Sequence, residues 1–128
     1  MKPNREELEG LLGREIRNME DARDACREAI ALGAGSVCLT LGPEGAMLVT
    51  KDRAFFSPPL PVKPRSFQGA GDAVTAGIAL EMERGEGEAE WLRSGCAAAQ
   101  ATIQLEGTQM CGFADYAAMR ARVVIRTL

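Results

Sequence analysis

The sequence contains no histidine, and lysine occurs only at positions 2, 51 and 63 among its 128 residues. The absence of histidine excludes a Ser-His-Asp triad, a Cys-His dyad, His-ligated zinc and haem on a proximal histidine. The formal net charge of −3 and the scarcity of lysine leave no basic surface of the kind that binds nucleic acids. Any chemistry must therefore use carboxylates, hydroxyls, thiols, cations or backbone N–H groups.

The four cysteines lack C-x-x-C spacing, which removes the zinc ribbon and the thioredoxin-like motif from consideration. Three of them, Cys26, Cys38 and Cys96, lie in apolar patterns and are expected as reduced core residues. The charged start of the chain is unlike a signal peptide, and no apolar run approaches the roughly 18 residues of a membrane helix. These features predict a cytoplasmic protein without a membrane or nucleic-acid partner.

The patterns along the chain predict an α/β fold in one soluble globular unit. Apolar spacing and capping residues predict helices over 5–13, after Asn4, and 19–32, after Asn18. The apolar run 36–41 is typical of a buried strand of a parallel sheet. The remaining expectations are a hairpin of strands 46–50 and 54–57, an extended proline-rich segment 58–65, helices over 69–84, 89–105 and 113–120, and a terminal strand 123–125.

The glycine-rich turn Gly69-Ala70-Gly71-Asp72 is the first candidate for chemistry. Its bare backbone at the start of a helix leaves N–H groups and a positive dipole end that suit an anion. Asp72 at that position could deprotonate an attacking hydroxyl. Taken alone, the tetrapeptide is more often an ordinary turn with an acid in a helix's first turn, and it matches neither a P-loop nor a dinucleotide fingerprint.

For each of two further motifs, taken alone, an ordinary structural role is the preferred interpretation. The stretch 40–45 (T-L-G-P-E-G) follows a buried strand, where α/β folds bind ligands, but it also fits a hairpin turn. Lys2-Pro3-Asn4 with Glu7 has the spacing of a capping box. Trp91 is expected as a helix–core contact and the acids of 81–90 as a solvated face.

The order of these motifs resembles one family. K-P-N-x-x-E, then T-L-G-x-x-G, then G-A-G-D resembles the carboxyl-terminal part of the PfkB (ribokinase-like) carbohydrate kinases. Residues 57–77 (S-P-P-L-P-V-K-P-R-S-F-Q-G-A-G-D-A-V-T-A-G) and 106–111 (E-G-T-Q-M-C) look like its phosphofructokinase branch. The resemblance implies the carboxyl-terminal part of a ribokinase-like α/β/α sandwich, with an incomplete sheet and flanking helices, and makes 1–128 a single partial domain, the nucleotide-binding half.

The resemblance also implies residue roles. Asp72 would be the catalytic base, and Gly69, Ala70 and Gly71 would form the anion hole. The nucleotide would be held by Lys2, Asn4, Thr40, Leu41, Gly42, Pro43, Glu44 and Gly45. Asn4 and Glu7 match a motif associated with Mg²⁺ and phosphate. A monovalent cation, K⁺ in relatives, would lie near Ser66, Gln68, Thr102, Leu105 and Gly107.

Family members are roughly twice as long, and their sugar-binding residues lie in the amino-terminal portion. The expected function is therefore that of an ATP-dependent sugar-phosphate kinase, with fructose phosphate or a similar sugar phosphate as acceptor, present as a fragment that lacks the sugar site. The alternatives are an inactive nucleotide-binding or subunit-assembly module, and an unrelated α/β domain with chance motifs. An incomplete sheet also predicts self-association, most simply as a homodimer.

Overall fold

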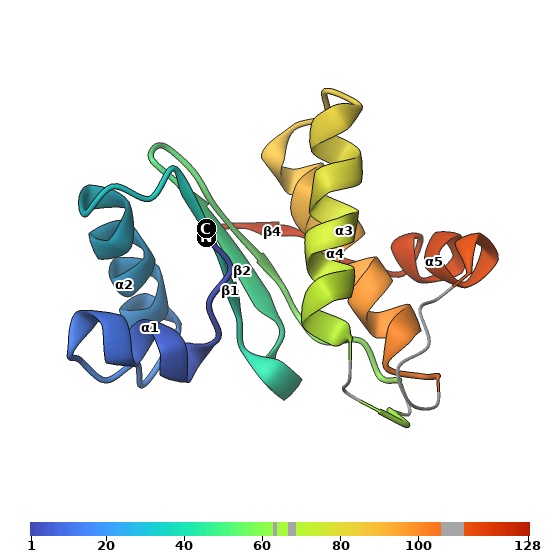
Figure 1. The fold of residues 1–128 in the computed structure, drawn as a ribbon, viewed down its shortest axis with the longest axis horizontal. Coiled ribbons are helices and arrows are strands. Elements are labelled where there is room, and N and C mark those ends of the chain that lie inside the picture. Colours follow the sequence, from blue (N-terminus) through green and yellow to red (C-terminus); the bar gives the residue numbers. More distant parts are fainter. Residues whose placement is uncertain (63, 67–68, 106–111) are drawn as a thin grey trace. The chain divides into compact units, whose positions relative to one another are not determined.

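The computed structural model describes residues 1–62, 64–66, 69–105 and 112–128. The chain divides into two compact units, one formed by Met1–Phe56 with Arg126–Leu128 and one by Ser57–Ile125. The chain contains both helices and strands: two helices come first, then three strands, then three helices and a short last strand (Figure 1).

Two helices of the first unit begin at the asparagines that the sequence indicated. In α1 (Arg5–Leu12), Oδ1 of Asn4 accepts a hydrogen bond from Glu7 N at 2.8 Å, and the helix ends at Gly13 with φ 65°. In α2 (Met19–Ala31), Oδ1 of Asn18 accepts from Asp21 N at 2.8 Å. Each cap satisfies one of the N–H groups that the first turn of a helix leaves unpaired.

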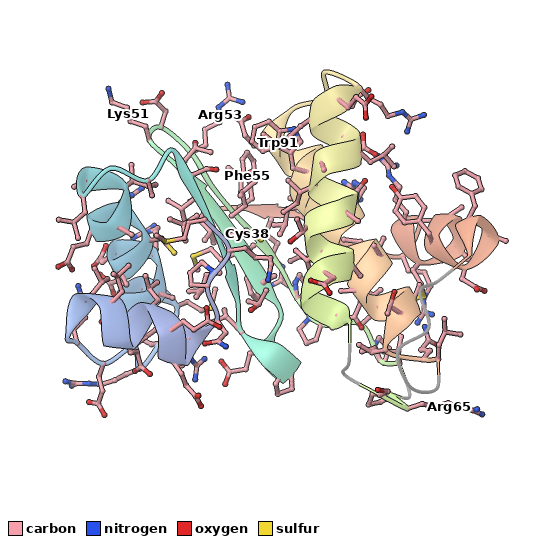
Figure 2. The ribbon with its side chains drawn as sticks, viewed as in Figure 1. Cys38, Lys51, Arg53, Phe55, Arg65 and Trp91 are labelled. Carbon is pink, nitrogen blue, oxygen red and sulfur yellow. The ribbon has the colours of Figure 1, made fainter. Side chains whose placement is uncertain are left out.

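The sheet of the first unit has the strand order β1-β2-β3-β4. β1 (Ser36–Thr40) pairs antiparallel with β2 (Ala46–Thr50), and β3 (Ala54–Ser57) pairs antiparallel with β4 (Arg126–Thr127). Lys51 and Arg53 lie at the exposed tip of the β2–β3 hairpin (Figure 2). The other edge of β1 is paired with residues 1–4, through a parallel bridge between Asn4 and Thr40.

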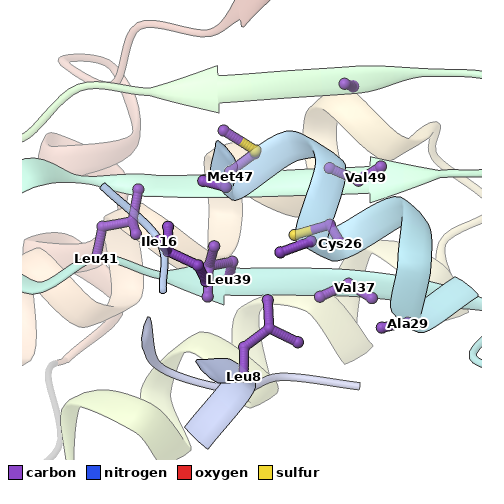
Figure 3. Packing of buried hydrophobic residues seen from close by; sticks show 12 residues of the cluster. Leu8, Ile16, Cys26, Ala29, Val37, Leu39, Leu41, Met47 and Val49 are labelled. Carbon is purple, nitrogen blue, oxygen red and sulfur yellow. The ribbon is translucent and has the colours of Figure 1, made fainter. Parts of the chain in front are cut away.

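The core of the first unit lies between the two helices and one face of the sheet. Figure 3 shows Cys26 of α2 among Val37, Leu39 and Met47 of the strands. Leu8 of α1 is completely buried in the same cluster. The alanines and the cysteine on the buried face of α2 are small, which lets this helix pack closely on the strands.

The second unit is built on two crossing helices, α3 (Ala70–Glu83) and α4 (Glu88–Thr102), with α5 (Phe113–Arg120) packed against α4. A β-carbon added at Gly77 of α3 would lie 2.4 Å from the carbonyl oxygen of Ser94 in α4. Real β-carbons do not approach a carbonyl that closely, so the crossing depends on this glycine. Gly95 of α4 faces Val74 and Ile78 of α3 in the same way, with contacts of 3.2 to 3.3 Å.

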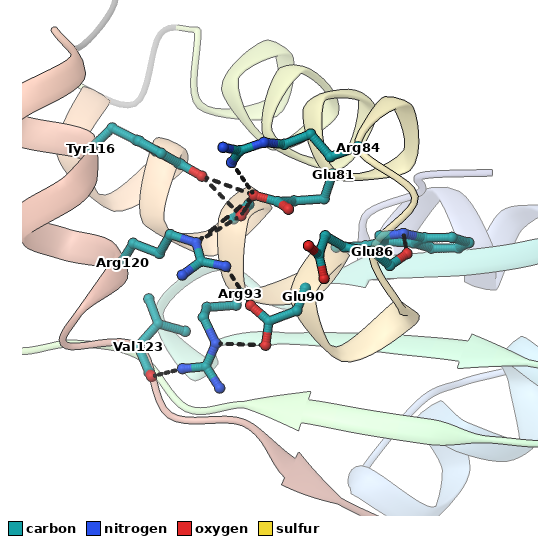
Figure 4. Close-up of polar contacts among 10 residues, drawn as sticks. Glu81, Arg84, Glu86, Glu90, Arg93, Tyr116, Arg120 and Val123 are labelled. Atoms are coloured by element: carbon teal, nitrogen blue, oxygen red, sulfur yellow. Dashed lines mark hydrogen bonds and ion pairs between the residues drawn. The ribbon is translucent and has the colours of Figure 1, made fainter.

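A buried carboxylate joins the three helices of this unit (Figure 4). Glu81 is only 1% exposed, and its Oε1 accepts from Ser94 Oγ at 2.8 Å and from Tyr116 OH at 3.4 Å. Arg120 of α5 donates to Ser94 Oγ at 3.2 Å and pairs with Glu90. A buried carboxylate is tolerated when hydroxyls and guanidinium groups satisfy it, as they do here.

Three expectations from the sequence need correction. Residues 123–125 are not a strand, since β4 is Arg126–Thr127. The strand expected in a parallel sheet, β1, pairs antiparallel with β2, while its other edge makes a parallel bridge between Asn4 and Thr40. Glu81 is not part of a solvated acidic face, because Ser94, Tyr116 and Arg120 surround it.

Candidate functional site

The first two motifs lie side by side in the first unit. Thr40 N donates to the carbonyl oxygen of Pro3 at 3.0 Å, and Cys38 N donates to that of Met1 at 2.8 Å. The amino-terminal segment therefore runs along β1 to the point where the T-L-G-P-E-G turn begins. The structure places Asn4, with the segment that contains Lys2, beside the strand that leads into the turn.

The turn itself is a single 3-10 turn, Gly42–Glu44, closed by backbone hydrogen bonds at its base. Leu41 N donates to Gly45 O at 2.9 Å, and Glu44 N donates to Leu41 O at 3.1 Å. Gly42 and Gly45 have φ angles of 56° and 109°, which L side chains rarely adopt. Gly42, Pro43 and Glu44 are exposed, so a ligand can approach the backbone of this turn.

The capping alternative for the amino-terminal motif is confirmed for Asn4, whose Oδ1 binds the N–H of Glu7. That oxygen is the helix cap, and the side chain of Glu7 is exposed in the first turn of α1. The two residues remain compatible with an indirect role toward Mg²⁺, because Mg²⁺ keeps several waters and is bound through few protein ligands.

The glycine-rich turn begins α3 in the second unit. Gly69 is the N-cap residue with φ 77°, and no described side chain caps the first turn of the helix. Asp72 is exposed in that first turn, and Ala70 and Gly71 are half-buried. Uncapped N–H groups at the positive end of a 14-residue helix form a ready site for an anion.

The end of α4 lies next to the residues that precede this turn. The carbonyl oxygen of Ile103 accepts from Arg65 N at 2.6 Å and from Ser66 N at 3.1 Å. A β-carbon at Gly69 would lie 3.9 Å from Cγ2 of Thr102. The structure therefore brings Ser66, Thr102 and the glycine turn together, while Gln68 and Gly107 lie outside the described residues.

Thr102 supplies a test of whether a cation fits here. Its Oγ1 is buried and has no hydrogen-bond partner within the described part of the chain, and the residue is 1% exposed. Its carbonyl accepts from Leu105 N at 3.0 Å. An unpaired buried hydroxyl oxygen suits a hard cation with oxygen ligands.

Among residues 1–62, 64–66, 69–105 and 112–128, no group of three or more His, Cys, Asp or Glu side chains is placed to hold a metal ion. Cys26 and Cys96 are free cysteines. Cys111 lies outside the described residues.

The sequence matches the model of the pfkB family carbohydrate kinases over residues 1–113. The chain belongs to this family. Its glycine turns and its K-P-N segment thus lie within the matched region. The prediction of a ribokinase-like PfkB fold with an incomplete sheet is confirmed.

Individual relatives agree with the family assignment. The chain is 35% identical over 127 residues to a 1-phosphofructokinase of Haloferax volcanii, covering 99% of this chain and 42% of that protein. It matches the crystal structure of phosphofructokinase-2 from Escherichia coli in complex with potassium, with a TM-score of 0.88 and 34% identity over 94% of this chain and 40% of that one.

A ribokinase of Arabidopsis thaliana, solved with ribose and ATP, matches with a TM-score of 0.85 and 28% identity, over 93% of this chain and 39% of that one. The chain therefore spans about two fifths of the length of the relatives it matches. No described helix has the length and apolar character needed to cross a membrane.

One feature of the second unit was missed by sequence reasoning. A hollow of about 590 Å³ lies against Glu81, with Arg84, Phe113, Tyr116 and Arg120 among its lining residues. Phe113 is 81% exposed at its rim, and its ring lies 6.1 Å from that of Tyr116. The sequence did contain one sign of this feature. Glu81 lies on the same face of the helix as Val74 and Gly77, which are buried.

Proposed function

We propose that this chain is the nucleotide-binding half of an ATP-dependent sugar-phosphate kinase of the phosphofructokinase type. The observation that carries the proposal is the uncapped glycine turn at the start of α3, with Asp72 in its first turn. The pairing of the K-P-N segment with the strand that leads to the T-L-G-P-E-G turn supports it independently. On this proposal, residues 1–128 make up a single partial domain.

The reaction is the transfer of the γ-phosphoryl group of ATP to a hydroxyl of fructose phosphate or a similar sugar phosphate. Asp72 accepts the proton of the hydroxyl as its oxygen forms the new bond to phosphorus. The bond between phosphorus and the β,γ-bridging oxygen breaks, and ADP leaves. The backbone N–H groups of Gly69, Ala70 and Gly71 stabilise the negative charge on the transferred group.

The nucleotide is held by residues of the first unit, namely Lys2, Asn4, Thr40, Leu41, Gly42, Pro43, Glu44 and Gly45. Bound Mg²⁺ would neutralise phosphate charge, with Asn4 and Glu7 acting on it indirectly. A monovalent cation, K⁺ in the relative solved with potassium, would lie near Ser66, Gln68, Thr102, Leu105 and Gly107. The unpaired Oγ1 of Thr102 supports that placement.

The sugar is bound by residues outside this chain, because the chain spans about two fifths of its relatives. The second candidate is a module that binds nucleotide or assembles with other subunits without catalysis. The two candidates share the nucleotide site and differ in whether phosphoryl transfer follows.

Isothermal titration calorimetry with Mg-ATP tests the proposal. Part of a cleft makes fewer contacts than a whole one, so we expect a Kd of about 1 mM, corresponding to about −4 kcal/mol. Substitution of Gly71 by Val, which crowds the first turn of α3, should weaken the binding further. Binding to DNA without binding to nucleotide would contradict the proposal.

A further inference from the structure

An ion pair connects the turn that we assign to the nucleotide with the start of α1. Arg5 Nη2 donates to Oε2 of Glu44 at 2.6 Å, across 39 positions of sequence. Arg5 follows Asn4 directly, and Glu44 is the last residue of the 3-10 turn. The Nε of Arg5 is buried and has no hydrogen-bond partner among the described residues. The ion pair of this guanidinium is the one with the Glu44 carboxylate.

The Arg5–Glu44 ion pair contributes little to the free energy of folding. The side chains of Arg5 and Glu44 are 36% and 60% exposed, and pairs with such exposure contribute about 1 kcal/mol or less to folding. The first unit contains a pair of the same kind between Arg14 and Glu28, at 3.2 Å and with exposures of 36% and 46%, and neither residue belongs to a glycine turn. What distinguishes the Arg5–Glu44 pair is its position in the turn.

Glu44 belongs to the proposed nucleotide turn through its backbone, whereas the charge of its side chain works against a polyphosphate at that turn. An uncompensated carboxylate within a turn that contacts a polyphosphate repels it, since like charges in partly exposed sites still interact over several ångströms. From this geometry we infer that Arg5 is a positioning residue: it cancels the charge of Glu44 and keeps that carboxylate turned toward α1, away from the nucleotide phosphates. The inference rests on the proposed function.

The test compares Mg-ATP with adenosine, which carries no phosphate. Both titrations are followed by NMR of the ¹⁵N-labelled 128-residue chain, through the amide signals of Gly42 and Gly45. Arg5→Met should raise the Kd for Mg-ATP about three- to tenfold and change the Kd for adenosine less than twofold. Adding Glu44→Gln to Arg5→Met should return the Kd for Mg-ATP to within about twofold of the unsubstituted chain, because no charge is then left unpaired.

Arg14→Met is the matched control, and it should leave both dissociation constants unchanged while lowering the melting temperature as much as Arg5→Met does. Equal Mg-ATP affinity of the Arg5→Met variant and the unsubstituted chain would overturn the inference and leave the proposed function standing. Loss of affinity that Glu44→Gln does not restore would also overturn it. Failure of the unsubstituted chain to bind either ligand would overturn the proposed function and this inference with it.

Discussion

Burial determines the chemistry of the thiol of Cys26, which lies in the core of the first unit. Removal from water disfavours the thiolate and raises the pKa of Cys26 from 9.0 to about 12. Because the pKa is raised by folding, the stability that the neutral thiol confers is complete below pH 9 and is lost as the pH rises toward 12. Burial also raises the pKa of Cys96 to about 11, while a hydrogen bond with Ser57 opposes that shift.

The first prediction concerns alkylation of Cys26. At pH 8.5 the folded chain should react with iodoacetamide at this position about a thousandfold more slowly than the chain in urea, because the thiolate fraction falls by that factor. Mass spectrometry of peptides after timed labelling measures both rates. Equal rates in the folded and unfolded chains would show that this thiol is not buried between α2 and the sheet.

The second prediction concerns Asp72 in an enzyme in which this chain is joined to a sugar-binding portion. Asp72→Asn keeps the size of the side chain but removes the base, so kcat should fall roughly 10²–10⁴-fold with the KM for ATP little changed. Steady-state kinetics of the purified variant measures both constants. A kcat within a factor of three of the parent enzyme would contradict the role of Asp72.

At the scale of elements, the crossing of α3 and α4 depends on glycines rather than on large side chains. The third prediction is that Gly77→Ala destabilises the chain by about 2–4 kcal/mol, because the new β-carbon would meet the Ser94 carbonyl at 2.4 Å. Urea unfolding measures the change.

Gly10→Ala provides the control for this substitution. It also replaces a helical glycine, but its β-carbon would meet nothing within 4 Å. It should stabilise the chain by up to about 1 kcal/mol through helix propensity. Similar effects of the two substitutions would mean that the helices do not approach closely at Gly77.

The elements differ in how far the sequence could predict them. Asn4 and Asn18 revealed the starts of α1 and α2, because a cap is a local interaction within four residues. The β2–β3 hairpin was equally local, and its predicted bounds are confirmed. The pairing of residues 1–4 with β1 and the position of β4 depend on contacts between distant parts of the chain, which no local pattern specifies.

The candidate site also has a part that the sequence predicts and a part that depends on distant contacts. The glycine turns and Asp72 were visible as motifs, and the structure confirms that Gly69 begins a helix. The position of the K-P-N segment beside Thr40 is a finding of the structure. The Arg5–Glu44 pair and the buried Glu81 were not predictable, because each depends on a partner 13 or more positions away. Both sets of contacts form only in the folded chain.

At the scale of the whole molecule, the exposed face of α3 bears on self-association. Ala76, Ala79, Leu80 and Met82 are exposed on this helix, whereas an isolated surface helix normally presents charged residues to water. The fourth prediction is that the chain self-associates at micromolar concentration, with a mass of at least twice 13.7 kDa by light scattering. Leu80→Lys should shift it toward the monomer, and a strictly monomeric parent chain would contradict the prediction.

The central claim is the proposal that this chain binds a nucleotide through its glycine turns. Residue-resolved NMR during a titration with Mg-ATP tests it most directly. The account predicts saturable shifts of the amide signals of Gly42, Gly45, Gly71 and Asp72 with a Kd of about 1 mM. Shifts confined to the hollow beside Glu81, with none at either turn, would contradict it.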